Sequence, residues 1–471
     1  MKDFNRNLKF DFFDIYDNYN YKNILFLVII IAVSSFLILI SGFNNFSGCY
    51  GYGASLSNNA GIKNADNKNK NPEIKNNSVN IAVIVPTNGR YKYFGKQFLD
   101  GILFSIQKNK KANIKFIIVS LPFNAGSGFI KNLFKSIDKK NISAIIGPLF
   151  VNQIAYFSKY SSIYKIPVFT PAPLNFSKYK SPYLFHYGMT VKNEVSADLQ
   201  YAETKGIDKI SVIYPDNAYG QKTIQYINAI GNKLGIDIVD ETAYERHTVD
   251  FFYNFNLLVR FQDMGHGHMT KAEENQLGVT PYDLMHGITK AKPYIPFDGL
   301  FLIGSTGKLK LILTQLAYYN ITGIKLFGLS SVDNTRFLNK YSFYMQGIVY
   351  PGGFFPDSKN KFVKNFVKSY NNYYNEKPNI LSAEGYDMGN IVIKSIMMHG
   401  GSNAYESIKN SIQANGGINN NRQLLYRSLL KLKSFKGVCG ISRIRGRDFT
   451  KGLYLFQLKN NKIYILKSPF N

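Results

Sequence analysis

Apolar residues in this chain come in short continuous runs that alternate with segments of helical period. The run Ile142–Ile146 ends at Gly147-Pro148, and a second run, Ile166–Thr170, ends before two nearby prolines. Between the two runs, Val151–Tyr164 places its apolar residues at about helical spacing. Short continuous apolar runs are typical of buried parallel strands. The pattern therefore predicts a strand, a helix and a second strand, with the carboxyl ends of both strands at one edge of a sheet.

The same unit recurs on both sides of this stretch, which predicts an α/β fold with two Rossmann-like lobes built on parallel sheets. Further strands, each followed by a helix, are predicted at Val79–Pro86, Asn113–Leu121, Lys209–Tyr214, Ile236–Tyr244 and Phe297–Gly304. We expect the body to span 79–471. The expected lobes are about 79–190 with 320–345, and about 191–319 with 346–471. Residues 260–296 lack this rhythm and are interpreted as an insertion.

The region before the body predicts export. Residues 24–43 contain an almost unbroken apolar run, which is typical of a signal peptide or a transmembrane helix. Lys22 precedes the run and basic residues are absent just after it, so residues 1–23 are expected in the cytoplasm and the rest outside. Residues 44–78 are rich in Asn, Gly, Ser and Lys and are predicted to form a flexible linker.

The four residues Phe46–Cys49 resemble a bacterial lipoprotein box, in which Cys49 becomes the lipidated N-terminus. Phe46 stands where Leu is usual, and Asn44-Asn45 separate the box from the apolar run. Lipidation at Cys49, an uncleaved helical anchor and ordinary signal cleavage all remain open. Each of them exports the body to the periplasmic side of the cell envelope, and the first two attach it to a membrane.

The charge of the chain changes this picture little. Its formal net charge is +27, but the lysines are scattered among Asn, Ile and Tyr along the whole length, which indicates a composition bias. We find no Arg-rich arm, no RNA-binding aromatic motif and no zinc-finger spacing, so nucleic acid is not expected as a partner. An anionic wall polymer or a membrane surface remains a possible partner for so basic a protein.

Signatures of enzymes and metal sites are weak. The chain has no G-x-S-x-G elbow, no Walker loop and no H-E-x-x-H motif. Ser136–Lys139 matches S-x-x-K, but no K-T-G follows it. His266 and His268 lie in a Gly-rich stretch that is interpreted as a loop and not as a metal site. We therefore expect a protein without catalysis, cofactor or metal, and we expect Cys439 to be a buried, inert thiol.

Several short pieces occur in an order that resembles the type I periplasmic binding-protein fold of the leucine-binding kind. They are IAVIVPTNGRYKYFGKQFLDG, AIIGPL, IPVFTPAP, ISVIYPDNAYGQ, FDGLFLIG, GIVYPGGFFPDS, AEGYD and FKGVCGISRIRGRDFTKGLYLFQL. The resemblance implies two lobes, joined by hinge strands, that close on a small solute, with uptake of an amino acid or related solute as the function.

Within this superfamily, the chain looks most like the penicillin-binding protein activators related to LpoA. The resemblance rests on Tyr214–Gly220, on Tyr244 with Asp250-Phe251, and on Pro296–Asp298. It implies an alternative function, in which the body docks on a membrane-bound cell-wall synthase and stimulates peptidoglycan synthesis. Solute binding and synthase activation are both carried forward.

Candidate ligand contacts follow from the loops at the predicted carboxyl ends of the strands. They are Arg90, Tyr91, Gly147, Pro148, Thr170, Ala172, Tyr219, Ser305, Thr306 and Ser330. Leucine-binding relatives usually have Ser or Thr after the Gly-Pro turn, whereas this chain has Leu149-Phe150 after Gly147-Pro148. The next loop reads Pro171-Ala172 where Ser is common. The sequence keeps Thr170 but lacks the usual hydroxyls at these two places, which argues against binding of the carboxylate of a free amino acid.

Overall fold

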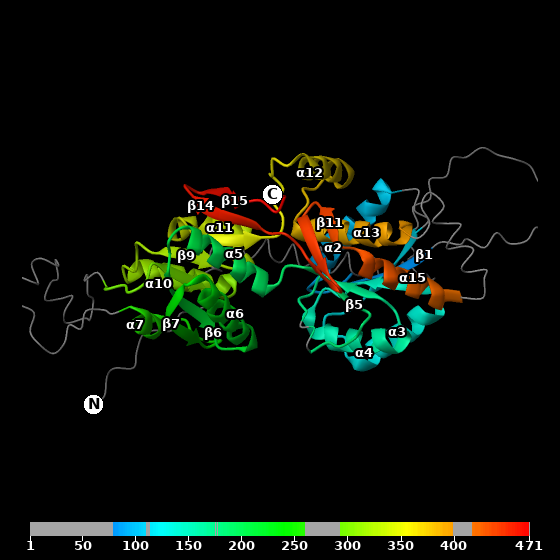
Figure 1. Ribbon diagram of the computed structural model, residues 1–471, viewed down its shortest axis with the longest axis horizontal. Coiled ribbons are helices and arrows are strands. Elements are labelled where there is room, and N and C mark those ends of the chain that lie inside the picture. The colour runs from blue at the N-terminus through cyan, green and yellow to red at the C-terminus, as the bar shows by residue number, and fades with distance from the viewer. Residues whose placement is uncertain are drawn as a thin grey trace, which may run out of the picture. The chain divides into compact units, whose positions relative to one another are not determined.

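The computed structural model describes residues 79–109, 114–174, 176, 178–259, 293–398 and 417–470, with the backbone alone for 417–420. These residues fall within one compact unit, which contains two β-sheets and their helices (Figure 1). The predictions for residues 1–78, including Cys49, lie outside the described residues. So does most of the expected insertion.

The first sheet has eight strands in the order β11-β12-β13-β5-β4-β3-β1-β2. Their bounds are β1 (Val79–Val85), β2 (Ile114–Ser120), β3 (Ile142–Ile146), β4 (Val168–Thr170), β5 (Leu184–Gly188), β11 (Ser434–Gly437), β12 (Gly440–Arg445) and β13 (Asp448–Thr450). Strands β1 to β5 and β13 pair in parallel, and β11 and β12 extend the sheet in antiparallel fashion. The parallel strands are continuous apolar runs because helices cover both of their faces.

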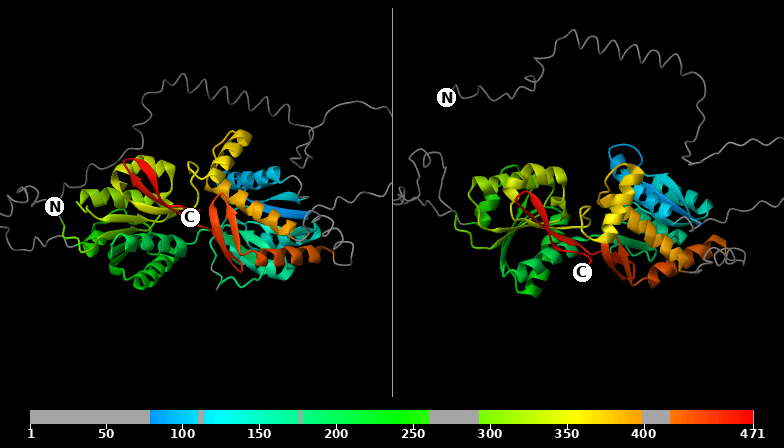
Figure 2. Two further views of the ribbon diagram at one scale, coloured as in Figure 1. Left: turned by 45° about the horizontal axis from the view of Figure 1, so that its top comes forward. Right: turned by 90° about the horizontal axis from the view of Figure 1, so that it is seen from above.

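The helices of the first lobe come from both ends of the body. They are α2 (Lys92–Lys108), α3 (Ser127–Lys139), α4 (Ile154–Tyr164), α12 (Lys361–Tyr374), α13 (Ile380–Met397) and α15 (Gly417–Lys431), with the short 3-10 helix η1 (Val151–Gln153) before α4. Helices α2, α13 and α15 pack on the face that carries Ile81 and Val83, and α3 and α4 pack on the face that carries Ile84. Figure 2 shows the late helices α13 and α15 beside the early elements of this lobe.

The second sheet has seven strands in the order β15-β14-β10-β9-β8-β6-β7. They are β6 (Lys209–Pro215), β7 (Asp237–Tyr244), β8 (Gly299–Leu302), β9 (Lys325–Gly328), β10 (Val349–Gly352), β14 (Tyr454–Lys459) and β15 (Lys462–Lys467). Its helices are α5 (Val191–Thr204), α6 (Ala218–Leu234), α7 (Phe252–Leu258), α10 (Thr306–Tyr318) and α11 (Thr335–Tyr341), with η2 (Ser330–Val332) and η3 (Ser342–Met345). Helices α5 and α6 cover one face, and α7, α10 and α11 cover the other.

The chain passes between the lobes three times: between β5 and α5, between β10 and α12, and between β13 and β14. The second and third crossings meet at Lys451, because a Cβ on Gly353 would lie 2.5 Å from the Lys451 amino nitrogen. Lys451 is buried and forms an ion pair with the nearly buried Glu384 of α13. Burial lowers the pKa of Lys451, but the charges of Glu384, Cys439 and Asp387 and the hydrogen bond to Glu384 together outweigh it, so the net shift of the pKa is upward.

The expected α/β fold with two lobes is confirmed, but the expected lobe boundaries are wrong. Residues 320–345, assigned above to the first lobe, contain β9 and α11 of the second. Of 346–471, assigned to the second lobe, the part from α12 to β13 belongs to the first. The error arose because strand pairing between distant segments leaves no trace in local periodicity. Strands β5, β11, β12 and β13 and helix α11 were not predicted.

Helices α2 and α13 lie in very close contact. A Cβ on Gly101 would lie 2.0 Å from the carbonyl oxygen of Ser382, and one on Gly385 would lie 2.1 Å from that of Phe98. Real Cβ atoms do not approach carbonyl oxygens so closely, so only glycine allows the two backbones to meet at this distance.

We expect Gly385→Ala to destabilise the protein by roughly 2 kcal/mol or more, because the added methyl group pushes α13 away from α2. Gly128→Ala in α3 is the matched control, since nothing lies within 4 Å of its added Cβ; it should be neutral or slightly stabilising. Urea unfolding of both variants measures the difference. Equal stability of the two variants would show that the helices can separate without cost.

Candidate ligand-binding site

The carboxyl ends of β1, β2 and β3 meet at one edge of the first sheet, because these strands are parallel and in register at Val85 with Ser120 and at Val83 with Ile146. The loops that follow them carry several of the predicted site residues. Such an edge is where ligands bind in open α/β sheets.

Three aromatic rings from three different loops gather at this edge. The ring centre of Tyr91 lies 4.5 Å from that of Phe123 and 5.0 Å from that of Phe150, and the last two are 5.0 Å apart. The guanidinium carbon of Arg90 lies 5.5 Å from the Tyr91 ring centre. Phe123 is 39% exposed, and Tyr91 and Phe150 are half-buried. We call Tyr91, Phe123 and Phe150 the aromatic triad.

The remaining predicted residues of this edge form its framework. Gly147 has a φ of 117° and precedes a cis bond to Pro148, and a Cβ at Gly147 would lie 2.3 Å from the Ile84 carbonyl oxygen. The Thr170 hydroxyl donates to the Pro148 carbonyl oxygen at 2.6 Å and accepts from the Ala172 N–H at 3.0 Å. Because Thr170 and Ala172 are buried, their side chains shape the loop and offer no surface to a solute here.

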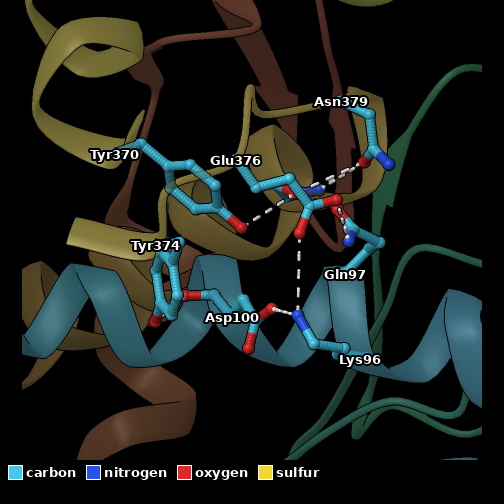
Figure 3. Close-up of polar contacts among 8 residues, drawn as sticks. Lys96, Gln97, Asp100, Tyr370, Tyr374, Glu376 and Asn379 are labelled. Carbon is cyan, nitrogen blue, oxygen red and sulfur yellow. Dashed lines mark hydrogen bonds and ion pairs between the residues drawn. The ribbon is translucent and has the colours of Figure 1, made fainter. Parts of the chain in front are cut away.

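Helix α2, whose first turn follows Tyr91, is fixed by a polar network (Figure 3). The Gln97 amide donates to Glu376 at 2.8 Å, and the Ser382 hydroxyl donates to the Gln97 side-chain oxygen at 3.0 Å. Lys96 pairs with Asp100 at 2.6 Å on the same helix. Gln97 and Ser382 are buried, so their mutual hydrogen bond satisfies groups that would otherwise be costly to bury. The network holds α2 against α13 behind the triad.

The second sheet gathers the other predicted residues at its own carboxyl edge, because β6, β8 and β9 are parallel. The Asn217 side chain caps α6 by accepting from the N–H groups of Tyr219 and Gly220, both at 3.0 Å. The Tyr219 side chain is 44% exposed. Ser305 precedes α10 without capping it through its side chain, and Thr306 is the first residue of that helix. This edge therefore presents hydroxyl groups.

Ser330 is tied to helix α5 through a buried carboxylate that sequence reasoning missed. The Ser330 N–H donates to Glu194 at 2.8 Å. Asp198 lies one turn further along α5 and is fully buried, and neither of its carboxylate oxygens has a hydrogen-bond partner among the described residues. Burial raises the pKa of Asp198 well above its ordinary value, and the Glu194 charge raises it further. Burial also raises the pKa of Glu194, although the Ser330 N–H opposes this.

Two members of the aromatic triad, Phe123 and Phe150, were also missed. Both directly follow predicted strands or turns, so the rule that selected Tyr91 could have found them. Asp387 had no such signal: it is buried on α13 and accepts from the Tyr187 hydroxyl at 2.7 Å and from the Val438 and Cys439 N–H groups at 2.8 and 2.9 Å. Cys439 is buried as expected, and burial raises its thiol pKa well above the ordinary value.

The fold and these two edges define a two-lobed type I periplasmic binding fold. The chain belongs to the periplasmic binding protein family, whose model matches residues 78–462. No curated protein matches the sequence. The particular likeness to penicillin-binding protein activators is not shown by these comparisons and stays a prediction.

Solved structures with the same fold come from transport proteins. One is described as a branched-chain amino acid ABC transporter from Rhodospirillum rubrum, with a TM-score of 0.64 and 14% identity over 83% of this chain and 100% of that one. A leucine-binding protein from Thermotoga maritima has a TM-score of 0.56 and 18% identity over 83% and 98%. A solute-binding protein from R. palustris in complex with benzoate has a TM-score of 0.54 and 16% identity over 83% and 96%. These likenesses establish the fold.

Two properties of the described part of the chain concern membranes and metals. None of the helices in that part of the chain is long and apolar enough to cross a membrane. That part also contains no group of three His, Cys, Asp or Glu side chains placed to hold a metal ion. His266, His268 and His286 of the expected insertion lie outside it.

We expect Thr170→Val to destabilise the protein by about 1–3 kcal/mol, because the Pro148 carbonyl and the Ala172 N–H lose a buried partner. Thr204→Val is the control: its exposed hydroxyl bonds only to the Tyr201 carbonyl oxygen of its own helix, so the change should stay within about 0.5 kcal/mol. Urea unfolding compares the two. If both variants behave alike, the hydroxyl does not hold this loop.

We expect Asp198→Asn to stabilise the protein at pH 7 by roughly 1 kcal/mol or more, and to have a smaller effect near pH 4. The pKa of this carboxyl group is higher in the folded protein than in the unfolded chain, where it is about 4. Stability is therefore greatest while the group is protonated, and it falls as pH rises above about 4. Unfolding free energies measured from pH 4 to 8 test this, with the exposed Asp208→Asn as the control. An effect independent of pH would contradict it.

Proposed function

We propose that this chain is a solute-binding protein that acts outside the cytoplasmic membrane and captures a small organic solute for an uptake system. The observation that carries the proposal is that both sheets place side chains with exposed surface in the loops at their carboxyl edges. The first sheet contributes Arg90 and the aromatic triad, and the second contributes Tyr219 and Ser305. Open α/β sheets bind ligands at this place, and family membership supports the same role.

In this proposal the two edges hold one solute between them, and the lobes move about the three crossings. The relatives named above supply candidate solutes, because one is a leucine-binding protein and another was solved with benzoate. Both compounds are small organic acids. We therefore propose amino acids and related organic acids as the solutes to test first.

Attachment to a membrane belongs to the proposal as well. The apolar residues 24–43 and the lipoprotein-like Cys49 support an anchor, and a permease in the same membrane would be the partner that receives the solute. Docking on a cell-wall synthase is the alternative, and it would require neither a solute nor a permease.

The experiment is a thermal-shift screen of the purified protein against amino acids, organic acids and sugars. A solute at 100 times its dissociation constant adds about 2.7 kcal/mol to the free energy of unfolding, so the melting temperature rises by a few degrees. Tyr219→Ala should reduce the shift, because it removes a side chain from the proposed site. Tyr318→Ala is the control, because the Tyr318 side chain is more exposed than that of Tyr219 and lies at the far end of α10 from the sheet edge.

A screen without any shift, together with capture of a peptidoglycan synthase by the protein, would replace the proposal by the activator function. Equal loss of the shift in Tyr219→Ala and Tyr318→Ala would place the solute elsewhere.

A further inference from the structure

The first-sheet edge combines an aromatic wall with an exposed cation, Arg90. The rings of Tyr91 and Phe123 are inclined by 35°, and Phe150 stands nearly perpendicular to Phe123 at 79°. The Arg90 side chain is exposed next to this wall, and it forms no ion pair with any described residue. Aromatic side chains that remain partly exposed together offer a surface on which a planar apolar group can stack.

The loops of this edge contain no acidic residue. They are Pro86–Tyr91, Leu121–Gly126, Gly147–Phe150 and Pro171–Leu174. A ligand ammonium group placed here would therefore lack a counter-charge. A carboxylate would instead meet the Arg90 guanidinium, whose planar set of donors matches the two carboxylate oxygens.

Two threonine hydroxyls of the first-sheet edge already donate their protons to other groups of the protein. Thr170 donates its proton to the Pro148 carbonyl oxygen at 2.6 Å, and Thr87 donates its proton to the Ser120 hydroxyl at 2.6 Å. Leu149 and Phe150 follow the Gly-Pro turn and supply no hydroxyl. Arg90 is an exposed charged donor that contacts the triad through the Tyr91 ring.

We propose that the solute is an aromatic carboxylate without an ammonium group, with its ring against the aromatic triad and its carboxylate on Arg90. This inference rests on the proposed function, and it names the solute class for that site. Two features of the first-sheet edge favour benzoate-like acids over zwitterionic amino acids. The aromatic triad offers an apolar surface for the ring, and the loops named above carry one positive charge, Arg90, and no negative charge.

The test is calorimetric titration of the full-length protein with benzoate, phenylacetate, cyclohexanecarboxylate, leucine and phenylalanine. Benzoate or phenylacetate should bind at least 10-fold more tightly than either amino acid, since the loops of the first-sheet edge offer no acidic partner to an ammonium group beside the triad. Cyclohexanecarboxylate keeps the charge and loses the π-system, so it should bind about 3- to 10-fold more weakly than benzoate.

Two variants locate the contacts. Arg90→Gln should weaken the binding of the tighter aromatic acid by at least 10-fold, since a charge-assisted pair is lost. Arg445→Gln is the control, because Arg445 is exposed at the opposite edge of the same sheet. Phe123→Leu should weaken binding by about 3- to 10-fold. Arg90 is exposed, so Arg90→Gln should unfold at the temperature of the parent protein. Phe123→Leu keeps an apolar side chain in the triad, so its unfolding temperature should change by only a few degrees.

The outcomes separate this inference from the proposed function. Tighter binding of leucine or phenylalanine than of both aromatic acids overturns the solute class and leaves a solute-binding protein. Aromatic-acid binding that survives both Arg90→Gln and Phe123→Leu overturns the assignment of the site. A protein that binds none of these acids, and no solute in the wider screen, overturns the proposed function and this inference with it.

Discussion

The close contact between α2 and α13 is the constraint on which the first lobe depends. It brings two segments that are far apart in the sequence within backbone distance, at Gly101 and Gly385, and it leaves no room for a side chain at either position. Gln97 and Ser382 then form a buried hydrogen bond across the same interface. Because α2 begins directly after Tyr91, the packing that stabilises the lobe also positions Tyr91 of the aromatic triad.

The two lobes solve the same local problem in the same way. In each lobe a proline stands at the end of the first parallel strand, Pro86 directly after β1 and Pro215 as the last residue of β6. The following helix packs a glycine against that proline's carbonyl oxygen. A Cβ on Gly95 would lie 1.9 Å from the Pro86 oxygen, and one on Gly220 would lie 1.9 Å from the Pro215 oxygen. The helix can therefore start very close to the carboxyl edge of the sheet, so residues of its first turn reach the site.

Local patterns predicted individual elements well and long-range pairing poorly. Strand β3 has the bounds that its apolar run indicated. Strand β5 was missed because its short run LFHYG contains His186, a buried polar residue that contacts Asp448 of β13 at 2.9 Å. That contact joins two strands that are far apart in the sequence, so local periodicity cannot predict it. The carboxyl-edge rule brought the predicted site residues to two sheet edges, but it could not tell that Thr170 and Ala172 turn inward.

The late strands β11, β12 and β13 have a consequence for how the protein is made. They complete a sheet that starts at Val79, so the first lobe is not encoded by one continuous stretch of the gene. No fragment with a single start and stop contains the first lobe without also containing β6 to β10 of the second. During synthesis or translocation, the eight-stranded sheet cannot be finished until Thr450 has emerged, long after β6 to β10 are available to pair. The edge of the sheet at β5 therefore stays unpaired while β6 to β10 are made. A chaperone that covers this edge would have to remain bound for that whole period.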